Sequence, residues 1–159
     1  MIEKGQALPD GQLMIMASDG PRPVSSQELC GSGTSVLFAV PGAFTPTCSA
    51  EHLPGFVERA DDFKDKGIDR LICLAVNDVF VMDAWGRQSG VGSSILMAAD
   101  GNGDFSRALG LDMDATAFGM GQRAQRFALI VRDGVVEELF VEAPGEFRVS
   151  SADYLLDRI

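Results

Sequence analysis

A threonine and a cysteine with the spacing of a reactive thiol site are the residues of this chain best suited to chemistry. Thr45 precedes Cys48 by three residues and follows Pro41 by four, in the stretch PGAFTPTC. Thiols react as thiolates, and a free thiol with a pKa of about 8.5 is only a few per cent ionised at neutral pH. Chemistry at Cys48 therefore requires surroundings that stabilise the sulfur anion.

Cys48 falls between a predicted strand and a predicted helix. Residues 35–40 form a nearly continuous apolar run of strand length, which is typical of a strand buried on both faces. After Cys48 the apolar residues take a helical spacing through Leu53, Phe56 and Phe63, with Pro54–Gly55 as a possible kink. The pattern predicts a helix over 48–63 whose positive end, with its unpaired N–H groups, lies at Cys48.

A helix start alone does not stabilise a thiolate enough. A thiol that is mainly ionised at pH 7 needs about 3.4 kcal/mol of preference for the anion. A helix terminus supplies about 0.3–1 kcal/mol, or about 2 kcal/mol when it is partly buried. A charge-assisted hydrogen bond adds about 1.5–3 kcal/mol. We therefore expect a cation from elsewhere in the chain to contact Cys48, with the Thr45 hydroxyl as a further donor.

The motif and its flanks carry a family resemblance. Pro-x-x-x-Thr-x-x-Cys between a strand and a helix resembles the active-site loop of the peroxiredoxins, thiol peroxidases with a thioredoxin fold. Four further segments resemble the type-five subgroup of that family: HLPGF from His52, VNDVFV from Val76, WGR from Trp85 and RAQRF from Arg123. The resemblance covers most of the chain. It implies reduction of hydrogen peroxide and alkyl hydroperoxides.

The resemblance also implies a role for each matched residue. Cys48 would attack the peroxide and become a sulfenic acid, while the Thr45 hydroxyl would bond both the thiolate and the peroxide. Pro41 would shield the thiolate and shape the loop. Arg126 matches the arginine that supplies the cation and polarises the peroxide. Arg123 is the alternative, because the sequence does not separate the two members of an Arg-x-x-Arg pair.

His52 is the only histidine and lies four residues after Cys48, on the same helix face. Two side chains do not make a zinc site. We therefore expect a supporting polar role for His52 rather than metal binding, and we expect neither a metal nor a cofactor. The stretch Asp100–Asp104 is close in composition to a calcium loop, but Leu111 stands where the twelfth-position carboxylate belongs. We expect it to cap a helix over 105–109 instead.

The remaining cysteines bear on how the sulfenic acid would be reduced. Type-five members with two active cysteines place the second one near the C-terminus, where this chain has Ser150 and Ser151. Cys30, beside glycines, is expected in a loop where it can be exposed, and Cys73 in a buried strand over 70–76. Neither cysteine stands at the position of the second active cysteine in those type-five members. We infer a one-cysteine mechanism with an external thiol: glutathione, with or without glutaredoxin, or thioredoxin.

Two other functions suit a reactive cysteine in this fold. One is a peroxide-sensing or chaperone-like interaction protein in which Cys48 is a switch, which would react once and stop. The other is a glutathione-binding module without peroxidase activity. Sustained peroxide consumption with a thiol reductant separates both from a peroxidase.

Composition limits the partners and the organisation. A chain of 159 residues suits one domain over 1–159. A net charge of −10 and a pI near 4.4 argue against nucleic acid or an anionic membrane as partner, because both would repel the chain. Met1–Gln6 is not a basic segment followed by an apolar core, so we expect a cytoplasmic protein. A homodimer is implied by the resemblance alone.

The remaining elements must position these residues. Turn signals in residues 1–34 predict a hairpin or strand annex, and the Asp133–Gly134 turn predicts a hairpin of 126–131 with 135–141. We also expect a helix over 79–87 with Phe80, Ala84 and Trp85 inward, a strand over 95–98, a loop over 112–122 and a helix over 151–159. In the resemblance, that loop lies near the active site and the dimer contact; loose core packing is the alternative. The fold expected is α/β and thioredoxin-like, a central mixed β-sheet flanked by helices, with an N-terminal hairpin extension.

Overall fold

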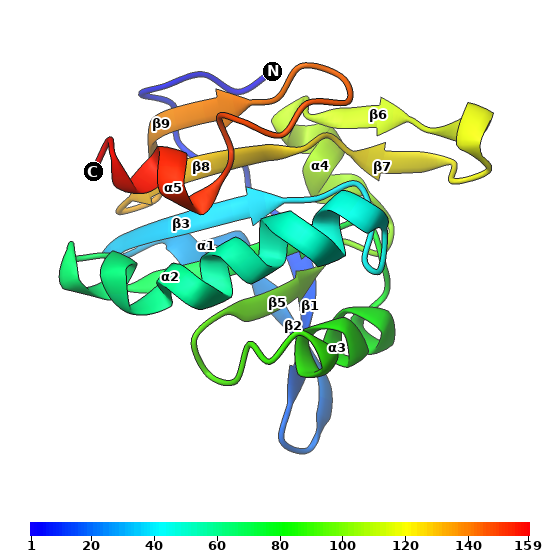
Figure 1. Ribbon diagram of the computed structural model, residues 1–159, viewed down its shortest axis with the longest axis horizontal. Coiled ribbons are helices and arrows are strands. Elements are labelled where there is room, and N and C mark those ends of the chain that lie inside the picture. Colours follow the sequence, from blue (N-terminus) through cyan, green and yellow to red (C-terminus); the bar gives the residue numbers. More distant parts are fainter.

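A seven-stranded mixed sheet forms the centre of the protein, in the order β2-β1-β5-β4-β3-β8-β9 (Figure 1). The computed structural model describes residues 1–159. The strands of this sheet are β1 (Gln12–Ala17), β2 (Gly20–Ser25), β3 (Thr34–Ala39), β4 (Arg70–Ala75), β5 (Leu96–Ala99), β8 (Phe127–Arg132) and β9 (Val135–Val141). The α-helices are α1 (Ser26–Cys30), α2 (Leu53–Asp65), α3 (Val79–Gln88), α4 (Asp104–Leu109) and α5 (Ala152–Leu156). The thioredoxin-like α/β fold expected from the sequence is confirmed.

Strand β3 lies inside the sheet, between β4 and β8. It pairs in parallel with β4 and antiparallel with β8, and all of its residues after Thr34 are buried. In the antiparallel register Ala39 faces Phe127. The end of β3 and the start of β8 therefore meet at one edge of the sheet, although 88 residues separate them in sequence.

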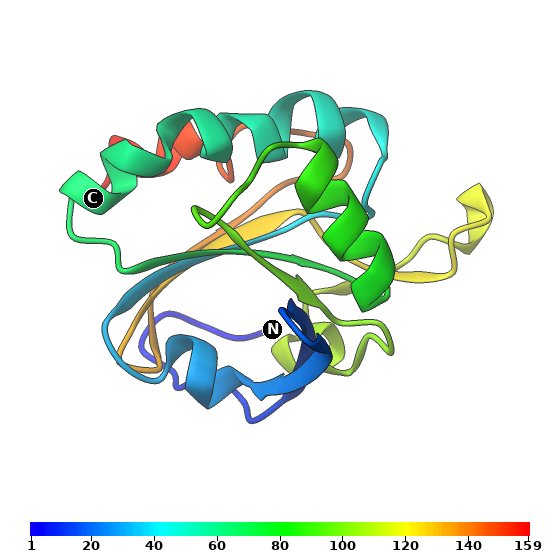
Figure 2. The same ribbon diagram turned by 90° about the horizontal axis from the view of Figure 1, so that it is seen from below.

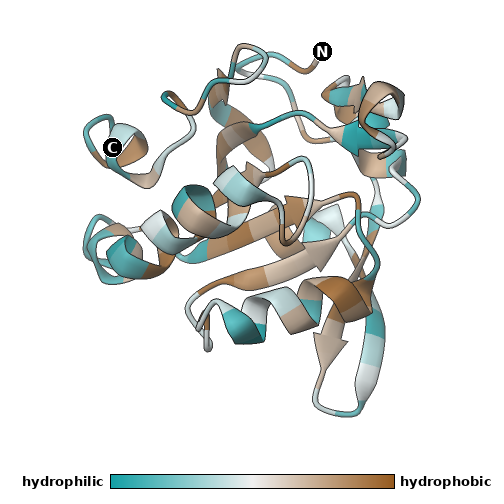
Figure 3. Cartoon of the chain, turned by 45° about the vertical axis from the view of Figure 1, so that its right-hand side comes forward, coloured by the Kyte–Doolittle hydropathy of each residue, from teal (hydrophilic) through white to brown (hydrophobic).

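Helices cover both faces of the sheet and divide the core in two. Helices α2, α3 and α5 lie on one face, and α1 and α4 on the other (Figure 2). The first core contains Phe38, Cys48 and Cys73; the second contains Cys30 and Phe127. The strands between the layers are largely hydrophobic, and the helices carry polar residues along their outer sides (Figure 3). None of the helices combines the length and the apolar character needed to cross a bilayer.

The predicted hairpin of β8 and β9 is confirmed. Asp133 and Gly134 have φ angles of 49° and 80°. Positive φ at both central residues is the geometry of the tight turn that Asp-Gly favours. Phe127 pairs with Val141, so the end of β9 also lies at the edge where β3 ends.

The predicted helix over 48–63 has a different start from the one expected. Two helical residues, Pro46 and Thr47, come before the π-helix η1 (Cys48–His52), which continues directly into α2. The Leu53 N–H donates to the Cys48 carbonyl five residues earlier. Pro54 follows in the first turn of α2 and has no N–H to donate. Because Pro54 cannot donate, the usual hydrogen bond to the carbonyl four residues earlier is absent there, and the π-helical turn lies directly before this gap.

The hairpin expected near the N-terminus is present as β1 and β2, but the exposed loop expected around Cys30 is wrong. Cys30 ends helix α1 and is 1% exposed. A capping box starts this helix: the Ser25 hydroxyl accepts from the Glu28 N–H, and the Glu28 side chain accepts from the Ser25 N–H. Ser-x-x-Glu is a recognisable helix signal, so the sequence did contain the information.

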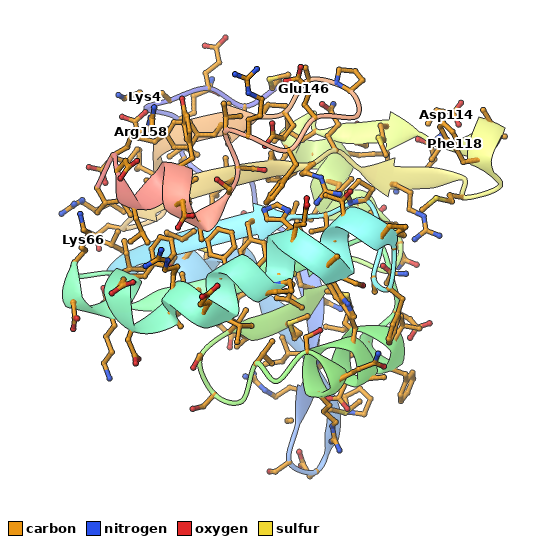
Figure 4. All side chains as sticks on the ribbon, in the orientation of Figure 1. Lys4, Lys66, Asp114, Phe118, Glu146 and Arg158 are labelled. Carbon is orange, nitrogen blue, oxygen red and sulfur yellow. The ribbon has the colours of Figure 1, made fainter.

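The segment expected as a loop over 112–122 is instead a two-stranded arm. Strands β6 (Asp112–Asp114) and β7 (Gln122–Ala124) pair antiparallel and enclose the 3₁₀ turn η2 (Thr116–Phe118). The arm projects from the body, with Phe118 near its tip (Figure 4). The Phe118 side chain is 81% exposed. The short strands have too few residues to show a period in the sequence.

Two expectations about helices α3 and α4 had different outcomes. In α3 Trp85 is buried, but Phe80 and Ala84 are exposed, and Val79 and Met82 face the core instead. Of the three residues expected to face inward, only Trp85 does so. The expected cap of α4 is confirmed, because the Asp100 carboxylate accepts the N–H groups of Phe105 and Ser106.

Candidate active site

Cys48 lies at the junction of β3 and the helix on its face of the sheet, and its side chain has no exposed surface. The Ser49 N–H donates to the Thr45 carbonyl at 2.9 Å, and the Trp85 indole N–H donates to the Ser49 hydroxyl at 3.0 Å. The loop before it holds Phe44 at φ 65°, a left-handed conformation that non-glycine residues rarely adopt. Local strain of this kind tends to occur in functional loops.

The Arg126 guanidinium supplies the cation that the sequence analysis required. Its Nη2–H donates to Cys48 Sγ at 3.1 Å. Arg126 directly precedes β8, whose first residue, Phe127, pairs with the last residue of β3. The strand register therefore brings together an arginine and a cysteine that lie 78 residues apart. This hydrogen bond is partly buried, and a charge-assisted bond of this kind favours the anionic form of a sulfur.

His52 contacts the same guanidinium. Arg126 Nη1 lies 2.8 Å from His52 Nδ1, and His52 Nε2 lies 3.0 Å from the Ser150 carbonyl oxygen. Arginine carries only donors, so Nδ1 accepts and Nε2 holds the ring proton that it donates to Ser150. Burial, and secondly the Arg126 charge, lowers the pKa of His52 to about 3. The ring is therefore neutral at physiological pH, and it orients Arg126 rather than competing for the sulfur.

Arg123, the alternative cation, has other partners. Its Nε–H donates to the Met120 carbonyl at 2.8 Å, and its Nη1–H donates to the Val76 carbonyl at 3.1 Å. These bonds join the base of the β6–β7 arm to the loop that follows β4. The structure thus brings Arg126, and not Arg123, onto the sulfur.

Thr45 and Pro41 flank the thiol without bonding to it. The Thr45 hydroxyl donates to the Gly42 carbonyl at 2.7 Å rather than to Cys48. Its expected bond to the thiolate is therefore absent from this structure, and the hydroxyl must rotate before it can donate to sulfur or to a peroxide. Pro41 is half-buried.

A cleft of about 410 Å³ is lined by Pro41, Thr47, Arg126 and the segment Glu142–Glu146, and Cys48 itself is not part of its lining. Glu146 lies on the loop after β9 (Figure 4). Arg126 thus both lines this cleft and contacts the Cys48 sulfur.

Two residues of this site, Glu142 and Ser150, were missed as functional candidates. Glu142 directly follows β9, and its N–H donates to the Arg126 carbonyl at 3.0 Å. Its Oε2 accepts the N–H and the hydroxyl of Ser150 at 2.8 Å and 2.7 Å. Burial opposes ionisation of Glu142, but the hydrogen bonds from Ser150 and Arg148 outweigh it and lower its pKa. Nothing in the local sequence marks either residue, because the pairing depends on the tertiary fold.

The other two thiols have different surroundings. Cys73 is fully buried in β4, and burial raises its pKa well above the ordinary value. Cys30 packs in the core on the opposite face of the sheet, where burial raises its pKa to about 11. All three cysteines are free, and no cluster of three or more His, Cys, Asp or Glu side chains is arranged to hold a metal ion.

Comparison with known proteins gives consistent matches over nearly the whole chain. Residues 3–156 match the family model described as Redoxin. Peroxiredoxin-2B of Arabidopsis thaliana is 44% identical over 156 residues, which cover 98% of this chain and 96% of that protein.

Solved structures agree with these matches. Reduced Prx3 of Vibrio vulnificus in complex with H₂O₂ has a TM-score of 0.96 and 48% identity, and the match covers 99% of both chains. The Plasmodium falciparum antioxidant protein, a 1-Cys peroxiredoxin, has a TM-score of 0.92 and 27% identity, with 99% of this chain and 98% of that chain covered.

Proposed function

The chain belongs to the peroxiredoxin family of thiol peroxidases, and from that premise we propose that Cys48 reduces hydrogen peroxide and alkyl hydroperoxides and is then regenerated by an external thiol. The single observation that carries the assignment of the residues is the 3.1 Å contact from Arg126 to Cys48 Sγ. It joins the one cysteine at a helix start to the cation that a thiolate requires.

The first step is transfer of one peroxide oxygen to sulfur. The Cys48 thiolate attacks one oxygen, the S–O bond forms and the O–O bond breaks, and the other oxygen leaves as water or an alcohol after it takes up a proton. The sulfur is oxidised to a sulfenic acid and the peroxide is reduced. Arg126 stabilises the thiolate and then the negative charge that develops on the leaving oxygen. The Thr45 hydroxyl, once turned from Gly42, is the second donor to the peroxide, and Pro41 keeps water from the sulfur.

The second step returns the cysteine to its thiol. A first external thiol attacks the sulfenic sulfur, forms a mixed disulfide and releases water. A second thiol then attacks that disulfide, which releases Cys48 and leaves the two external thiols joined. We propose glutathione as this thiol, with or without glutaredoxin, or else thioredoxin. The balance is one peroxide and two thiols consumed for one alcohol, one water and one disulfide.

Three features support the one-cysteine form of this cycle, a variant within the type-five subgroup. Cys30 lies in the opposite core layer from Cys48. Cys73 is sealed within a central strand, with its pKa raised by burial. Ser150 occupies the region where the second cysteine would stand, and its hydroxyl is already bonded to Glu142. The Plasmodium relative described above is itself a 1-Cys peroxiredoxin.

Stopped-flow kinetics test the proposal. Trp85 is the only tryptophan and bonds to Ser49, next to Cys48, so its fluorescence is a natural probe of the thiol. Reduced wild type should show a rapid fluorescence change with hydrogen peroxide, and the Cys48→Ser variant should show none. With excess glutathione and glutaredoxin, or with thioredoxin and its reductase, the wild type should consume peroxide continuously. A single turnover that then stops would favour the sensor function instead.

Mass spectrometry tests the one-cysteine mechanism separately. After one equivalent of peroxide without reductant, we expect a sulfenic acid on Cys48, trapped by dimedone. A disulfide from Cys48 to Cys30 or Cys73 would refute the external-thiol mechanism and leave the peroxidase activity standing.

A homodimer and a cytoplasmic location are further parts of the proposal. Phe44, Phe80 and Phe118 are each at least 47% exposed, and large exposed apolar side chains suit a protein interface. The three thiols are free, as a reducing compartment would keep them. Sedimentation equilibrium of the wild type and of a Phe80→Lys variant tests the first point; a monomeric wild type at micromolar concentration would contradict it.

A further inference from the structure

The guanidinium that touches Cys48 is one member of a chain of hydrogen bonds. Arg126 Nη1–H donates to His52 Nδ1 at 2.8 Å, and His52 Nε2–H donates to the Ser150 carbonyl at 3.0 Å. The position of the Ser150 carbonyl thus fixes which ring nitrogen of His52 carries the proton. It thereby fixes the acceptor that His52 presents to Arg126.

Ser150 is in turn held by one oxygen of Glu142. Glu142 Oε2 accepts the Arg148 N–H at 2.7 Å, the Ser150 N–H at 2.8 Å and the Ser150 hydroxyl at 2.7 Å. Ser150 has no exposed surface, and Glu142 is 7% exposed. We call this arrangement of Glu142, Arg148 and Ser150 the Glu142 clamp. It locks the backbone turn that carries the Ser150 carbonyl.

The clamp is not built for stability alone. Glu142 Oε1 is buried and has no hydrogen-bond partner, and it is the only such side-chain atom in the protein. A buried polar atom without a partner is unfavourable. The protein contains a closely similar arrangement without that defect: Asp100 Oδ2 accepts the N–H and hydroxyl of Ser106 at 2.8 Å and 2.7 Å, and Asp100 Oδ1 accepts the Phe105 N–H at 3.2 Å. Departures from full hydrogen bonding of this kind are expected near functional sites.

From this geometry we infer that Glu142 is a positioning residue for catalysis, which acts through Ser150 and His52 to hold the Arg126 guanidinium against the Cys48 sulfur. The inference rests on the proposed role of Arg126. Glu142 also holds Arg126 from the backbone side, since the Glu142 N–H donates to the Arg126 carbonyl. Both ends of Arg126, its main chain and its guanidinium, are thus connected to the same residue.

Substitution of Glu142 tests the inference, with three readouts that simple destabilisation would not move together. We expect Glu142→Ala to lower kcat/KM for hydrogen peroxide by about tenfold, the effect of one lost hydrogen bond or two. The thiolate absorbance at 240 nm should titrate at higher pH than in the wild type. The ¹⁵N shifts of His52, the only histidine, should move away from those of a ring protonated at Nε2. Glu142→Gln, which keeps an acceptor oxygen for Ser150, should restore most of each property.

The matched control is Asp100→Ala, which breaks the similar arrangement at helix α4. It should lower the free energy of unfolding while the His52 shifts and the thiolate titration stay at wild-type values. Ser150→Ala removes only the hydroxyl bond and should give a smaller change of the same sign, which keeps the test valid should Glu142→Ala not fold. The inference is overturned if Glu142→Ala and Ser150→Ala leave the His52 shifts and the thiolate titration unchanged, or if Asp100→Ala alters them equally.

Arg126→Ala, measured in parallel, separates this inference from the proposed function. If Arg126→Ala changes the rate and Glu142→Ala does not, only the role of Glu142 is refuted. If Arg126→Ala itself has no effect, the proposed role of Arg126 is wrong.

Discussion

Cys48 and Cys30 are both buried thiols with an arginine beside them, but the two arginines bond differently. Arg126 donates to the Cys48 sulfur. Arg70 donates instead to the carbonyls of Leu29 and Ser32, on either side of Cys30. Burial raises the pKa of Cys30 to about 11, although Ser35 and Arg70 act in the opposite direction. A nearby cation is thus not enough to lower the pKa of a buried thiol.

The ends of the helices explain the difference. Cys30 is the last residue of α1, where the terminal carbonyls lack intrahelical partners and attract the guanidinium. Cys48 lies in the first turn of its helix, which begins at Pro46, and the first N–H groups of a helix, rather than its carbonyls, lack intrahelical partners. An arginine at that end finds no competing carbonyl acceptors of the helix, so its N–H groups are available to the sulfur and to His52.

Removing the arginine beside each thiol is the most severe test of the comparison between Cys48 and Cys30. Arg126→Ala should lower kcat/KM for hydrogen peroxide by about 10²–10³-fold, as expected for loss of a donor to developing negative charge. Arg70→Ala should leave that constant within about twofold, because the Arg70 guanidinium bonds to the carbonyls of Leu29 and Ser32 and not to the Cys48 sulfur. Stopped-flow fluorescence of Trp85 measures both. Equal losses in the two variants would mean that net charge, and not the contact to sulfur, controls the rate.

The alkaline stability of the fold tests whether Cys30 is held as a neutral thiol. A thiol whose folded pKa of about 11 exceeds its ordinary value of 9.0 stabilises the fold at lower pH, and the contribution is lost as pH rises. The full loss, reached well above pH 11, should be about 2.7 kcal/mol at 1.36 kcal/mol per pKa unit, and about 1.9 kcal/mol of it should fall between pH 9 and pH 11. Urea unfolding at both pH values should show a smaller pH dependence in Cys30→Ala. Cys73 titrates alike in both proteins, so a pH dependence equal to that of the wild type would contradict this account.

The stability of the fold in acid tests the Cys48 side of the comparison, where His52 contacts Arg126. The folded pKa of His52, about 3, is below its ordinary value of 6.5, so the unfolded chain binds the proton first. Stability is complete above pH 6.5 and falls with decreasing pH, by about 2 kcal/mol between pH 6.5 and pH 5. The chain has no other histidine, so His52→Gln should remove this slope in urea unfolding. If the slope persists in His52→Gln, another group is responsible.

A small effect on chemistry is also expected at Arg123. Its guanidinium bonds to the carbonyls of Met120 and Val76 and has no contact with sulfur. Arg123→Ala should loosen the β6–β7 arm and change kcat/KM for peroxide by less than about threefold, the effect of a neutral hydrogen bond at a distance. Titration of the thiolate absorbance should match the wild type. If only Arg123→Ala shifted that titration, the assignments of the two arginines would be reversed.

Local signals were sufficient for some of the regular elements. The apolar run at β3, the Asp-Gly turn between β8 and β9 and the Asp100 cap of α4 each act over a few residues and were predicted correctly. Prediction was poorer where the information was weak or non-local. The β6–β7 arm has strands of only three residues. Which side of α3 faces the core depends on how the helix packs against β1 and β5. At Cys30 two local signals conflict: the neighbouring glycines favour a loop, whereas the Ser-x-x-Glu capping box favours the helix α1 that forms.

The sequence by itself determined that Cys48 stands where a strand gives way to a helix, because the period of the apolar residues changes there within a dozen positions. It also limited the cation to two arginines. Only the tertiary structure decided between them, since the choice depends on the register in which β8 lies against β3 and so brings Arg126 to the sulfur. The same long-range pairing joins Glu142 and Ser150 to the site. No local pattern records such contacts, because each requires two segments that meet only when the sheet has formed.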